Sequence, residues 1–379
     1  MILTQPRLNI QPRLNIQPRL NKVRNGLFAL SGTVLALGLA SCEPQATPPQ
    51  AGAPAAQGGG QTITLNGAGA SFPAPLYQRW FAEYNRLNPN IQISYQSVGS
   101  GAGVQQYLAR TVDFGATDAP LTAEERQQFQ AQNNAEPIQI PLTGGSVVMA
   151  YNLEGIDNLR LSREAYCGIV EGRITTWNDP QIAQANPGVT LPNLPVNFVH
   201  RSDGSGTTFI FTNHIDAACP NWTAGAGRAI DWPVGSGAKG NEGITTQVQQ
   251  SQGAIGYVEA AYATENNLNV ASLQNRAGQY IEPTPESAAQ ALEGQTIPAD
   301  LALLVPDPTD AEAYPIVGLT WLLLYNQYDD AAKANALREF VNWALNEGDQ
   351  FATELGYIPL EGEVAQRVQS VVQQQLAAR

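Results

Sequence analysis

Basic residues, histidines and cysteines are scarce in this chain of 379 residues, and each shortage excludes a class of function. There are 20 Lys and Arg against 33 Asp and Glu, so the net charge of −13 disfavours polynucleotides and anionic lipid surfaces as partners. The two histidines and three cysteines form no CxxC motif and no cluster with the spacing of a zinc or iron-sulfur site. We therefore expect no nucleic-acid partner, no metal and no cofactor.

The N-terminal apolar run is too short to span a bilayer. Fifteen uncharged residues, 26–40, follow the basic pair Lys22 and Arg24, which is the length of a signal-peptide apolar region. The run ends in LASC at Cys42, similar to the lipobox of bacterial lipoproteins. We predict that residues 1–41, including the repeated QPRLNI leader, are removed and that Cys42 is lipidated. The mature chain would then carry 15 basic and 33 acidic residues.

Residues 42–61 contain mainly Pro, Ala, Gly and Gln and have no periodicity, which predicts a disordered tether behind the lipid anchor. The protein is expected on the outer, periplasmic side of the cytoplasmic membrane. It is expected to act as a monomer.

From residue 62 onward, short β-rich runs alternate with helical segments. The helical run 74–89 has Leu76, Trp80 and Tyr84 at helical spacing, and the run 91–98 alternates as a strand does. This βαβα order predicts the α/β class with a largely parallel sheet. We expect the chain to begin one lobe with residues 62–142, build a second with residues 143–316, and return to the first with residues 317–379.

Three segments share one design, a strand followed by a turn of glycine and small hydroxyl residues and then a helix. They are residues 67–72, 99–103 and 201–208. Backbone N–H groups at a helix N-terminus bind anions, and glycine lets an anion approach closely. Arg201 adds a guanidinium that can bind an oxyanion with two parallel bonds, with Asp203 placed to support it. The pattern favours an anion site.

Five longer motifs carry a family resemblance. They are GAGASFPAPLYQRW, SYQSVGSGAGVQQYLARTVDFGATDAPLT, HRSDGSGTTFIFT, GAKGNEGI and GAIGYVEAAYA. Together they resemble the phosphate-binding protein of bacterial phosphate ABC importers, from about Asn66 to Gly356. The resemblance implies a two-lobed periplasmic-binding-protein fold of type II, with phosphate in the cleft between lobes joined by hinge strands. It also implies delivery to the membrane permease subunits of such an importer.

Carried over residue by residue, the resemblance implies a phosphate site built from both lobes. Its residues would be Ser71, Phe72, Ser100, Asp118, Arg201, Ser205, Gly206 and Thr207, with Asp203 supporting Arg201. Ser71 stands where many relatives have Thr, and Gly101 where some have Ser. An ionised Asp118 can only accept hydrogen bonds, so it favours a ligand that carries a proton, as phosphate does and sulfate does not. Without the resemblance, Asp118 would be read as a turn cap.

Two other functions stay open on the residues alone, a binding protein for another tetrahedral oxyanion and a secreted phosphatase. The nucleophile pattern G-x-S-x-G fails at Asp203, and the glycine-rich segment 235–240 lacks the ending of a nucleotide P-loop. We therefore predict that the protein is not an enzyme. Cys167 and Cys219 are exported together, but their spacing does not show whether they pair.

Overall fold

The computed structural model describes residues 62–378 of the chain. The predictions for the leader, the signal peptide, Cys42 and the whole tether lie outside the described residues. Within residues 62–378, no helix is both long enough and apolar enough to cross a bilayer.

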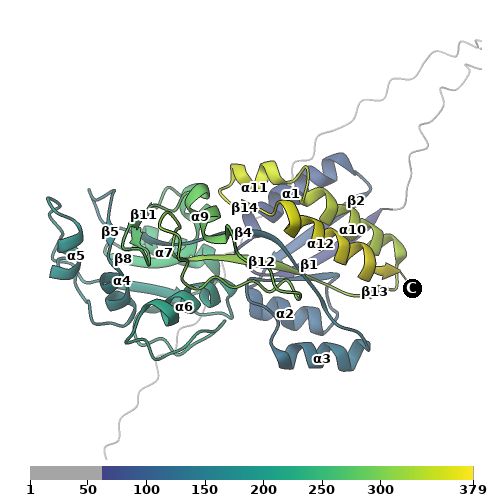
Figure 1. The fold of residues 1–379 in the computed structure, drawn as a ribbon, viewed down its shortest axis with the longest axis horizontal. Coiled ribbons are helices and arrows are strands. Elements are labelled where there is room, and N and C mark those ends of the chain that lie inside the picture. The colour runs from purple at the N-terminus through teal and green to yellow at the C-terminus, as the bar shows by residue number, and fades with distance from the viewer. Residues whose placement is uncertain (1–61, 379) are drawn as a thin grey trace, which may run out of the picture. The chain divides into compact units, whose positions relative to one another are not determined.

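The described chain folds into two α/β lobes joined by long strands (Figure 1). The first lobe begins with β1 (Ile63–Gly69), α1 (Ala74–Leu87), β2 (Ile91–Ser97), α2 (Ser100–Leu108), β3 (Phe114–Thr117) and α3 (Ala123–Asn133). Its C-terminal part contains β13 (Gln327–Tyr328), α10 (Ala331–Ala344), α11 (Asp349–Glu354), β14 (Ile358–Pro359), α12 (Gly362–Gln375) and β15 (Ala377–Ala378). The strands that join the lobes are β4 (Ile138–Tyr151) and β12 (Val317–Leu324).

The second lobe lies between these two strands in the sequence. Its elements are β5 (Arg160–Leu161), α4 (Arg163–Val170), α5 (Pro180–Ala185), β6 (Asn197–Arg201), α6 (Gly206–Ala218), β7 (Ser236–Ala238), α7 (Gly240–Gln250), β8 (Ala254–Glu259), α8 (Ala260–Glu265), β9 (Asn269–Val270), β10 (Ser272–Gln274), β11 (Tyr280–Ile281) and α9 (Pro285–Leu292).

The main sheet is mixed, whereas the sequence suggested a largely parallel one. Its strand order is β2-β1-β3-β12-β4-β8-β6-β7, with β14 and β9 also pairing with β4. The strands β2, β1 and β3 are parallel, and so are β8, β6 and β7. The central pair β12 and β4 is antiparallel because the chain leaves the first lobe through β4 and returns through β12.

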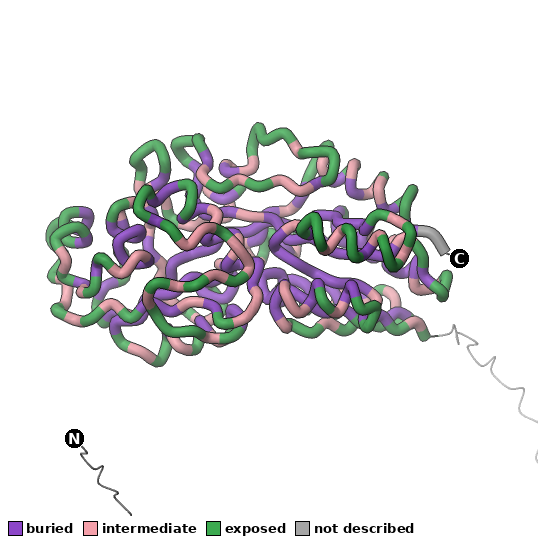
Figure 2. The backbone as a smooth tube through the Cα atoms, turned by 90° about the horizontal axis from the view of Figure 1, so that it is seen from below, coloured by how far each residue is buried: buried purple, intermediate pink, exposed green. Residues whose placement is uncertain are grey.

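Apolar patterning explains how the lobes pack onto this sheet. Helix α1 buries Leu76, Trp80 and Tyr84 on one face, as their spacing predicts. All fourteen residues of β4 are buried, so this strand is covered along both faces. In Figure 2 the buried strands run through the middle of both lobes, and the exposed residues lie on outer helices and loops.

The second lobe also contains a disulfide between Cys167 and Cys219, the pairing that the sequence left open. Cys167 lies in α4, and Cys219 follows the last turn of α6. The bond therefore ties the C-terminal end of α6 to its neighbour helix.

Candidate anion-binding site

The three glycine-rich turns lie where strands of the two lobes end and helices begin. In the first lobe, β1 ends before Ser71, α2 begins at Ser100, and Asp118 follows β3. In the second lobe, β6 ends at Arg201 and α6 begins at Gly206. Ligands of open α/β sheets bind beyond the carboxyl ends of the strands, which is where these residues lie.

The turns of the two lobes meet directly. Gly101 N–H donates to the carbonyl of Gly204 at 2.8 Å, and Gly206 N–H donates to Ser100 Oγ at 3.0 Å. A methyl group placed on Gly206 would lie 2.5 Å from Asp118 Cβ, so only glycine allows this approach. The structure therefore places first-lobe and second-lobe donors against each other in a closed arrangement.

Asp118 is a fully buried carboxyl at the centre of this contact. Its Oδ1 accepts the hydroxyl hydrogen of Thr320 at 2.7 Å, and its Oδ2 lies 3.4 Å from Ser100 Oγ. Burial raises the pKa of Asp118 to about 7, against the lowering effects of the Thr320 hydrogen bond, the Arg201 charge and the Ser100 hydrogen bond. The carboxyl can therefore change its protonation state near neutral pH.

Arg201 is the buried cation of the second lobe, and only 3% of the residue is exposed. Its Nε and Nη2 donate to Oδ1 and Oδ2 of Asp203 at 2.7 and 2.6 Å, and its Nη1 lies 3.5 Å from Thr207 Oγ1. Burial would raise the pKa of Asp203, but the hydrogen bond and charge of Arg201 outweigh it and the pKa lies below the ordinary value. Asp203 thus fixes the plane of the guanidinium.

Helix α6 presents its N-terminus to the contact between the lobes. Ser205 is its N-cap residue, with Oγ accepting the N–H of Thr208 at 3.0 Å. Gly206 and Thr207 are the first residues of the helix, and both are buried. The positive end of the helix dipole is therefore directed at the side where Asp118 and Ser100 lie.

Two residues that the sequence analysis did not select complete the network. Asn241, near the start of α7, donates through Nδ2 to Ser71 Oγ at 2.9 Å and to Thr207 Oγ1 at 3.1 Å. Thr320, which donates to Asp118, lies where the pairing of β12 with β4 shifts register. Such an irregularity redirects a side chain near functional sites.

The structure thus brings the predicted residues together in two hydrogen-bonded groups, which adjoin at the neighbouring residues Gly206 and Thr207 of α6. One group links Ser71, Thr207 and Arg201 through Asn241, and the other links Gly206, Ser100 and Asp118. Phe72 follows Ser71 at the same turn, and its buried ring packs edge-on against Tyr357. Ser205 adjoins the network as the helix cap. Asn241 had a signal in the sequence, because GAKGNEGI repeats the strand, glycine turn and helix design.

A serine nucleophile would need a histidine partner. His214 hydrogen-bonds to the Tyr166 hydroxyl and the Pro306 carbonyl, and His200 to the Arg201 carbonyl. Within residues 62–378 the structure forms no His–Ser205 hydrogen bond, and it groups no three His, Cys, Asp or Glu side chains that could hold a metal.

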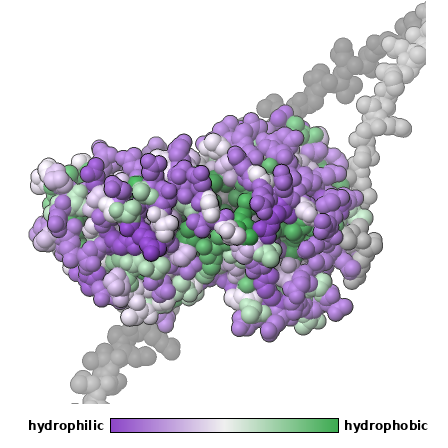
Figure 3. All heavy atoms as spheres, in the orientation of Figure 1, coloured by the Kyte–Doolittle hydropathy of each residue, from purple (hydrophilic) through white to green (hydrophobic). Residues whose placement is uncertain are grey.

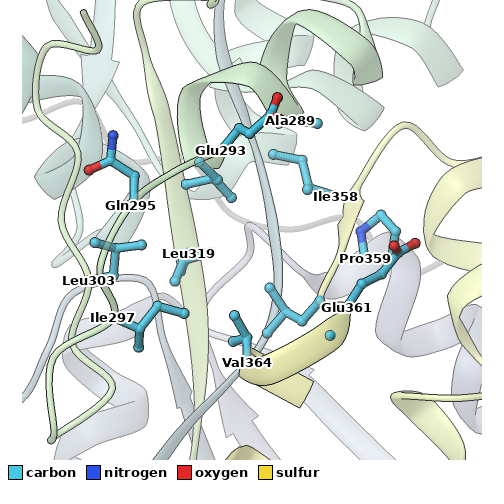
Figure 4. A pocket seen from close by; sticks show the side chains of 13 residues that line it. Ala289, Glu293, Gln295, Ile297, Leu303, Leu319, Ile358, Pro359, Glu361 and Val364 are labelled. Carbon is cyan, nitrogen blue, oxygen red and sulfur yellow. The ribbon is translucent and has the colours of Figure 1, made fainter. Parts of the chain in front are cut away.

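An apolar pocket of about 560 Å³ lies away from this network, between the end of α9, β12 and the start of α12 (Figure 4). Leu292, Leu319 and Ile358 line it, together with Glu293 and Glu361. Figure 3 shows apolar side chains gathered near the middle of the same face. The pocket is lined by two carboxylates and by no basic residue, so it is unsuited to an anion. The hydrogen-bonded residues described above therefore remain the candidate site.

Comparison with known proteins agrees with the fold. The pattern of the family described as "PBP superfamily domain" matches residues 50–347, and the chain belongs to this superfamily of two-lobed proteins. A phosphate-binding protein from Stenotrophomonas maltophilia has the same fold, with a TM-score of 0.67, 21% identity, and 81% of this chain and 93% of that chain covered.

Within the superfamily, the chain belongs to the family of the proteins named "Phosphate-binding protein PstS". It is 41% identical to the one from Pasteurella multocida over 316 residues, covering 82% of this chain and 90% of the relative. It is 34% identical to the one from Methanocaldococcus jannaschii over 330 residues, covering 80% and 84%. The resemblance and the α/β two-lobed fold class that the sequence predicted are therefore confirmed.

Proposed function

We propose that this protein captures inorganic phosphate outside the cytoplasmic membrane and delivers it to an ABC-type phosphate permease. The observation that carries the proposal is the network in which Arg201 and the α6 N-terminus of one lobe meet Ser71, Ser100 and Asp118 of the other. The relatives at up to 41% identity are named for phosphate binding, which agrees with this chemistry.

In this proposal the ligand is held by the eight residues that the sequence analysis named. Arg201 would supply the formal positive charge, and N–H groups of Phe72, Gly206 and Thr207 would supply uncharged donors. Hydroxyl groups of Ser71, Ser100, Ser205 and Thr207 would add further hydrogen bonds. We add Asn241 as a residue that orients Ser71 and Thr207 toward the ligand, because its side-chain amide donates to both hydroxyl oxygens.

Asp118 would select a ligand that brings its own proton. An ionised carboxylate accepts a hydrogen bond from hydrogen phosphate, whereas sulfate would oppose it with unprotonated oxygens. Two buried acceptors that face each other have both given up hydrogen bonds to water without gaining new ones. This desolvation cost should lead the site to reject sulfate. This reading favours phosphate over the alternative of a general tetrahedral-oxyanion carrier.

Binding would close the two lobes around the ligand. The contacts Gly101–Gly204 and Gly206–Ser100 cross between the lobes, so donors from both would reach one anion only in a closed state. A ligand that contacts both lobes binds the closed state better and shifts the equilibrium toward it. We keep the lobe boundaries at residues 62–142 plus 317–379 and residues 143–316, with β4 and β12 as hinge strands.

The protein would act without catalysis. Its relatives are binding proteins, and its Ser205 hydroxyl caps a helix rather than pairing with a histidine.

Lipidation at Cys42 would anchor the protein at the outer face of the cytoplasmic membrane, where it would act as a monomer. The substitution Cys42→Ser should release it from the membrane fraction without changing phosphate affinity, and unchanged retention would refute the anchor.

Isothermal titration of the mature chain with phosphate, sulfate and arsenate tests the proposal. We expect one phosphate per protein, and we expect arsenate, which also carries a proton, to compete. Sulfate at equal concentration should not compete at about pH 8.5, where Asp118 is ionised. Sulfate binding as tight as phosphate binding would refute the role of Asp118, and release of phosphate from an aryl phosphate ester would favour the phosphatase.

A further inference from the structure

Glu259 is a fully buried acid at the junction of the two lobes, and the phosphate site proposed above does not use it. It is the last residue of β8, opposite Val147 of the hinge strand β4. Its Oε2 accepts the N–H of Ala261 at 3.0 Å and caps α8. Within residues 62–378, Oε1 has no hydrogen-bond partner, and it lies close to Gly145 and the Phe72 ring.

The geometry of Tyr357 indicates a hydrogen on Glu259. The Tyr357 hydroxyl lies 2.7 Å from the Phe72 carbonyl oxygen and 2.9 Å from Glu259 Oε2. A hydroxyl has one hydrogen, so it can donate to one of these two oxygens. If it donates to the closer one, Phe72 O, then the contact with Glu259 is a hydrogen bond only when Glu259 is a carboxylic acid and donates to Tyr357.

The surroundings of Glu259 disfavour its ionised form. Burial raises its pKa well above the ordinary value, and the charges of Glu265 and Asp118 act in the same direction. The other titratable groups that face it are the hydroxyls of Tyr357 and Tyr262, whose own pKa values burial raises, so both stay neutral. The hydrogen bond from Ala261, and the one that Tyr357 can donate to an ionised carboxylate, lower the Glu259 pKa but do not cancel the rise.

Glu259 is connected to both sides of the proposed phosphate site. Through Tyr357 it reaches the carbonyl of Phe72, in the turn that would offer the Phe72 N–H to the ligand. Through its backbone N–H it donates to Asn241 Oδ1 at 3.1 Å, and this orients the Asn241 amide toward Ser71 and Thr207. One residue of the second lobe thus supports donors of both lobes.

We propose that Glu259 is a positioning residue that acts as a neutral carboxylic acid, donating to Tyr357 so that Tyr357 can hold the Phe72 carbonyl in the closed site. The proposal rests on the proposed phosphate function. Loss of the proton would turn the Tyr357 hydroxyl toward Glu259 and release the Phe72 carbonyl. It would also leave an uncompensated charge with Oε1 unpartnered, so phosphate binding should weaken as pH rises through the pKa of Glu259.

The substitution Glu259→Gln tests this, because a glutamine amide can donate to Tyr357 but cannot ionise. Its NH2 group in place of Oε2 loses the bond from the Ala261 N–H at every pH, which changes affinity by a constant factor. We expect the ratio of variant to wild-type affinity to stay constant while Glu259 is protonated, and to rise about tenfold or more over the pH range in which wild type loses the infrared band of a protonated carboxylic acid. Titration of phosphate and of Asp118 affects both proteins and cancels in the ratio. Glu154→Gln, which removes an exposed charge from the turn after β4, should leave the ratio to wild type independent of pH. A ratio for Glu259→Gln that stays flat while this band is lost overturns the proposal.

Infrared spectroscopy without phosphate tests the proton directly, even if Glu259→Gln does not fold. Wild type near pH 8 should show the carbonyl band of a protonated carboxylic acid, and this band should persist in Asp118→Asn. In Tyr357→Phe the band should shift, because the acid loses its hydrogen-bond partner, whereas Tyr314→Phe, which removes another buried hydroxyl, should leave it in place. Absence of the band in wild type overturns the assignment. Failure of wild type to bind phosphate at any pH would instead refute the proposed function.

Discussion

Replacing Asp118 by Asn should convert a site that discriminates against sulfate into one that accepts it. In the structure Thr320 donates to Oδ1, so the amide oxygen of the variant would occupy that position. The amide nitrogen would then replace Oδ2, the oxygen that lies toward Ser100 and Gly206. A hydrogen-bond donor would therefore face the ligand where the wild type offers an acceptor.

The size of the effect follows from the cost of opposing two buried acceptors. Leaving two buried acceptors opposed would cost about 3 kcal/mol or more, but Asp118 can instead take up a proton, because burial raises its pKa to about 7. That protonation costs about 2 kcal/mol at pH 8.5, so sulfate should lose about 2 kcal/mol in wild type at this pH. Removing the cost in Asp118→Asn should tighten sulfate binding by about thirtyfold at pH 8.5. Phosphate should change by less than about tenfold, because it loses a bond to Asp118 but can accept one from the amide.

The pH dependence supplies a second measurement with a defined sign. The pKa of Asp118 is raised to about 7, so the carboxyl is neutral and can donate below this pH and is ionised above it. Sulfate affinity of the wild type should therefore rise as pH falls from about 8.5 to 5.5, and that of Asp118→Asn should stay flat. For the ligand-free protein, the raised pKa means that stability falls as pH rises from the unfolded-state value toward 7. Near pH 8 the variant should therefore be more stable, on the order of 4 kcal/mol.

Isothermal titration with both anions across this pH range, together with thermal unfolding, provides the assay. Asp113→Asn is a matched control, because Asp113 lies at the start of β3 and pairs with Lys333 away from the network. It should change neither anion's affinity beyond about twofold. Sulfate rejection that is the same in wild type and Asp118→Asn, at every pH, would refute the argument that Asp118 selects the ligand by its proton.

Three further predictions concern the donors and the scaffold. Ser100→Ala should weaken phosphate binding by about 1.5–3 kcal/mol in titration, and less than a twofold loss would place Ser100 outside the site. Arg201→Lys keeps the charge but loses the planar fork, so affinity should fall in the order wild type, Lys, Ala, with at least about 3 kcal/mol lost in Ala; binding by Ala within threefold of wild type would contradict the cleft. Breaking Cys167–Cys219, which spans 52 residues, should cost about 4 kcal/mol and lower the melting temperature in calorimetry while leaving one phosphate per protein, and an unchanged melting temperature would contradict this.

The sequence predicts the elements that have strong local signals. The helical spacing of Leu76, Trp80 and Tyr84 and the strand alternation of residues 91–98 correspond to α1 and β2 in the structure. The direction of the long strands could not be obtained in this way, because β4 and β12 are both apolar runs. Their antiparallel pairing depends on the return of the chain from the second lobe, which brings Val317 beside Ser146 and Leu324 beside Ile138. Periodicity reports burial of a strand but not which strand lies beside it.

In the candidate site too, the sequence predicts contacts between neighbouring residues but not contacts between residues far apart in the chain. Arg201 and Asp203 belong to one turn, so the ion pair between them follows from local geometry and could be expected from the sequence. Thr320 reaches Asp118 across 202 positions, and Tyr357 reaches Phe72 across 285. Neither Thr320 nor Tyr357 stands in a motif that indicates ligand binding.

Such distant residues matter because the donors at the turns need support that the turns cannot supply themselves. A glycine-rich turn can approach an anion closely, but the same absence of side chains leaves its peptide groups free to rotate. Tyr262 and Tyr357 hold the carbonyls of Ser71 and Phe72, each at 2.7 Å, and Asn241 holds the Ser71 hydroxyl from the opposite lobe. The selectivity proposed for this site would therefore depend on buried side chains that arrive through tertiary packing. Substitutions at these positions should alter phosphate binding without removing any atom that the proposal places against phosphate.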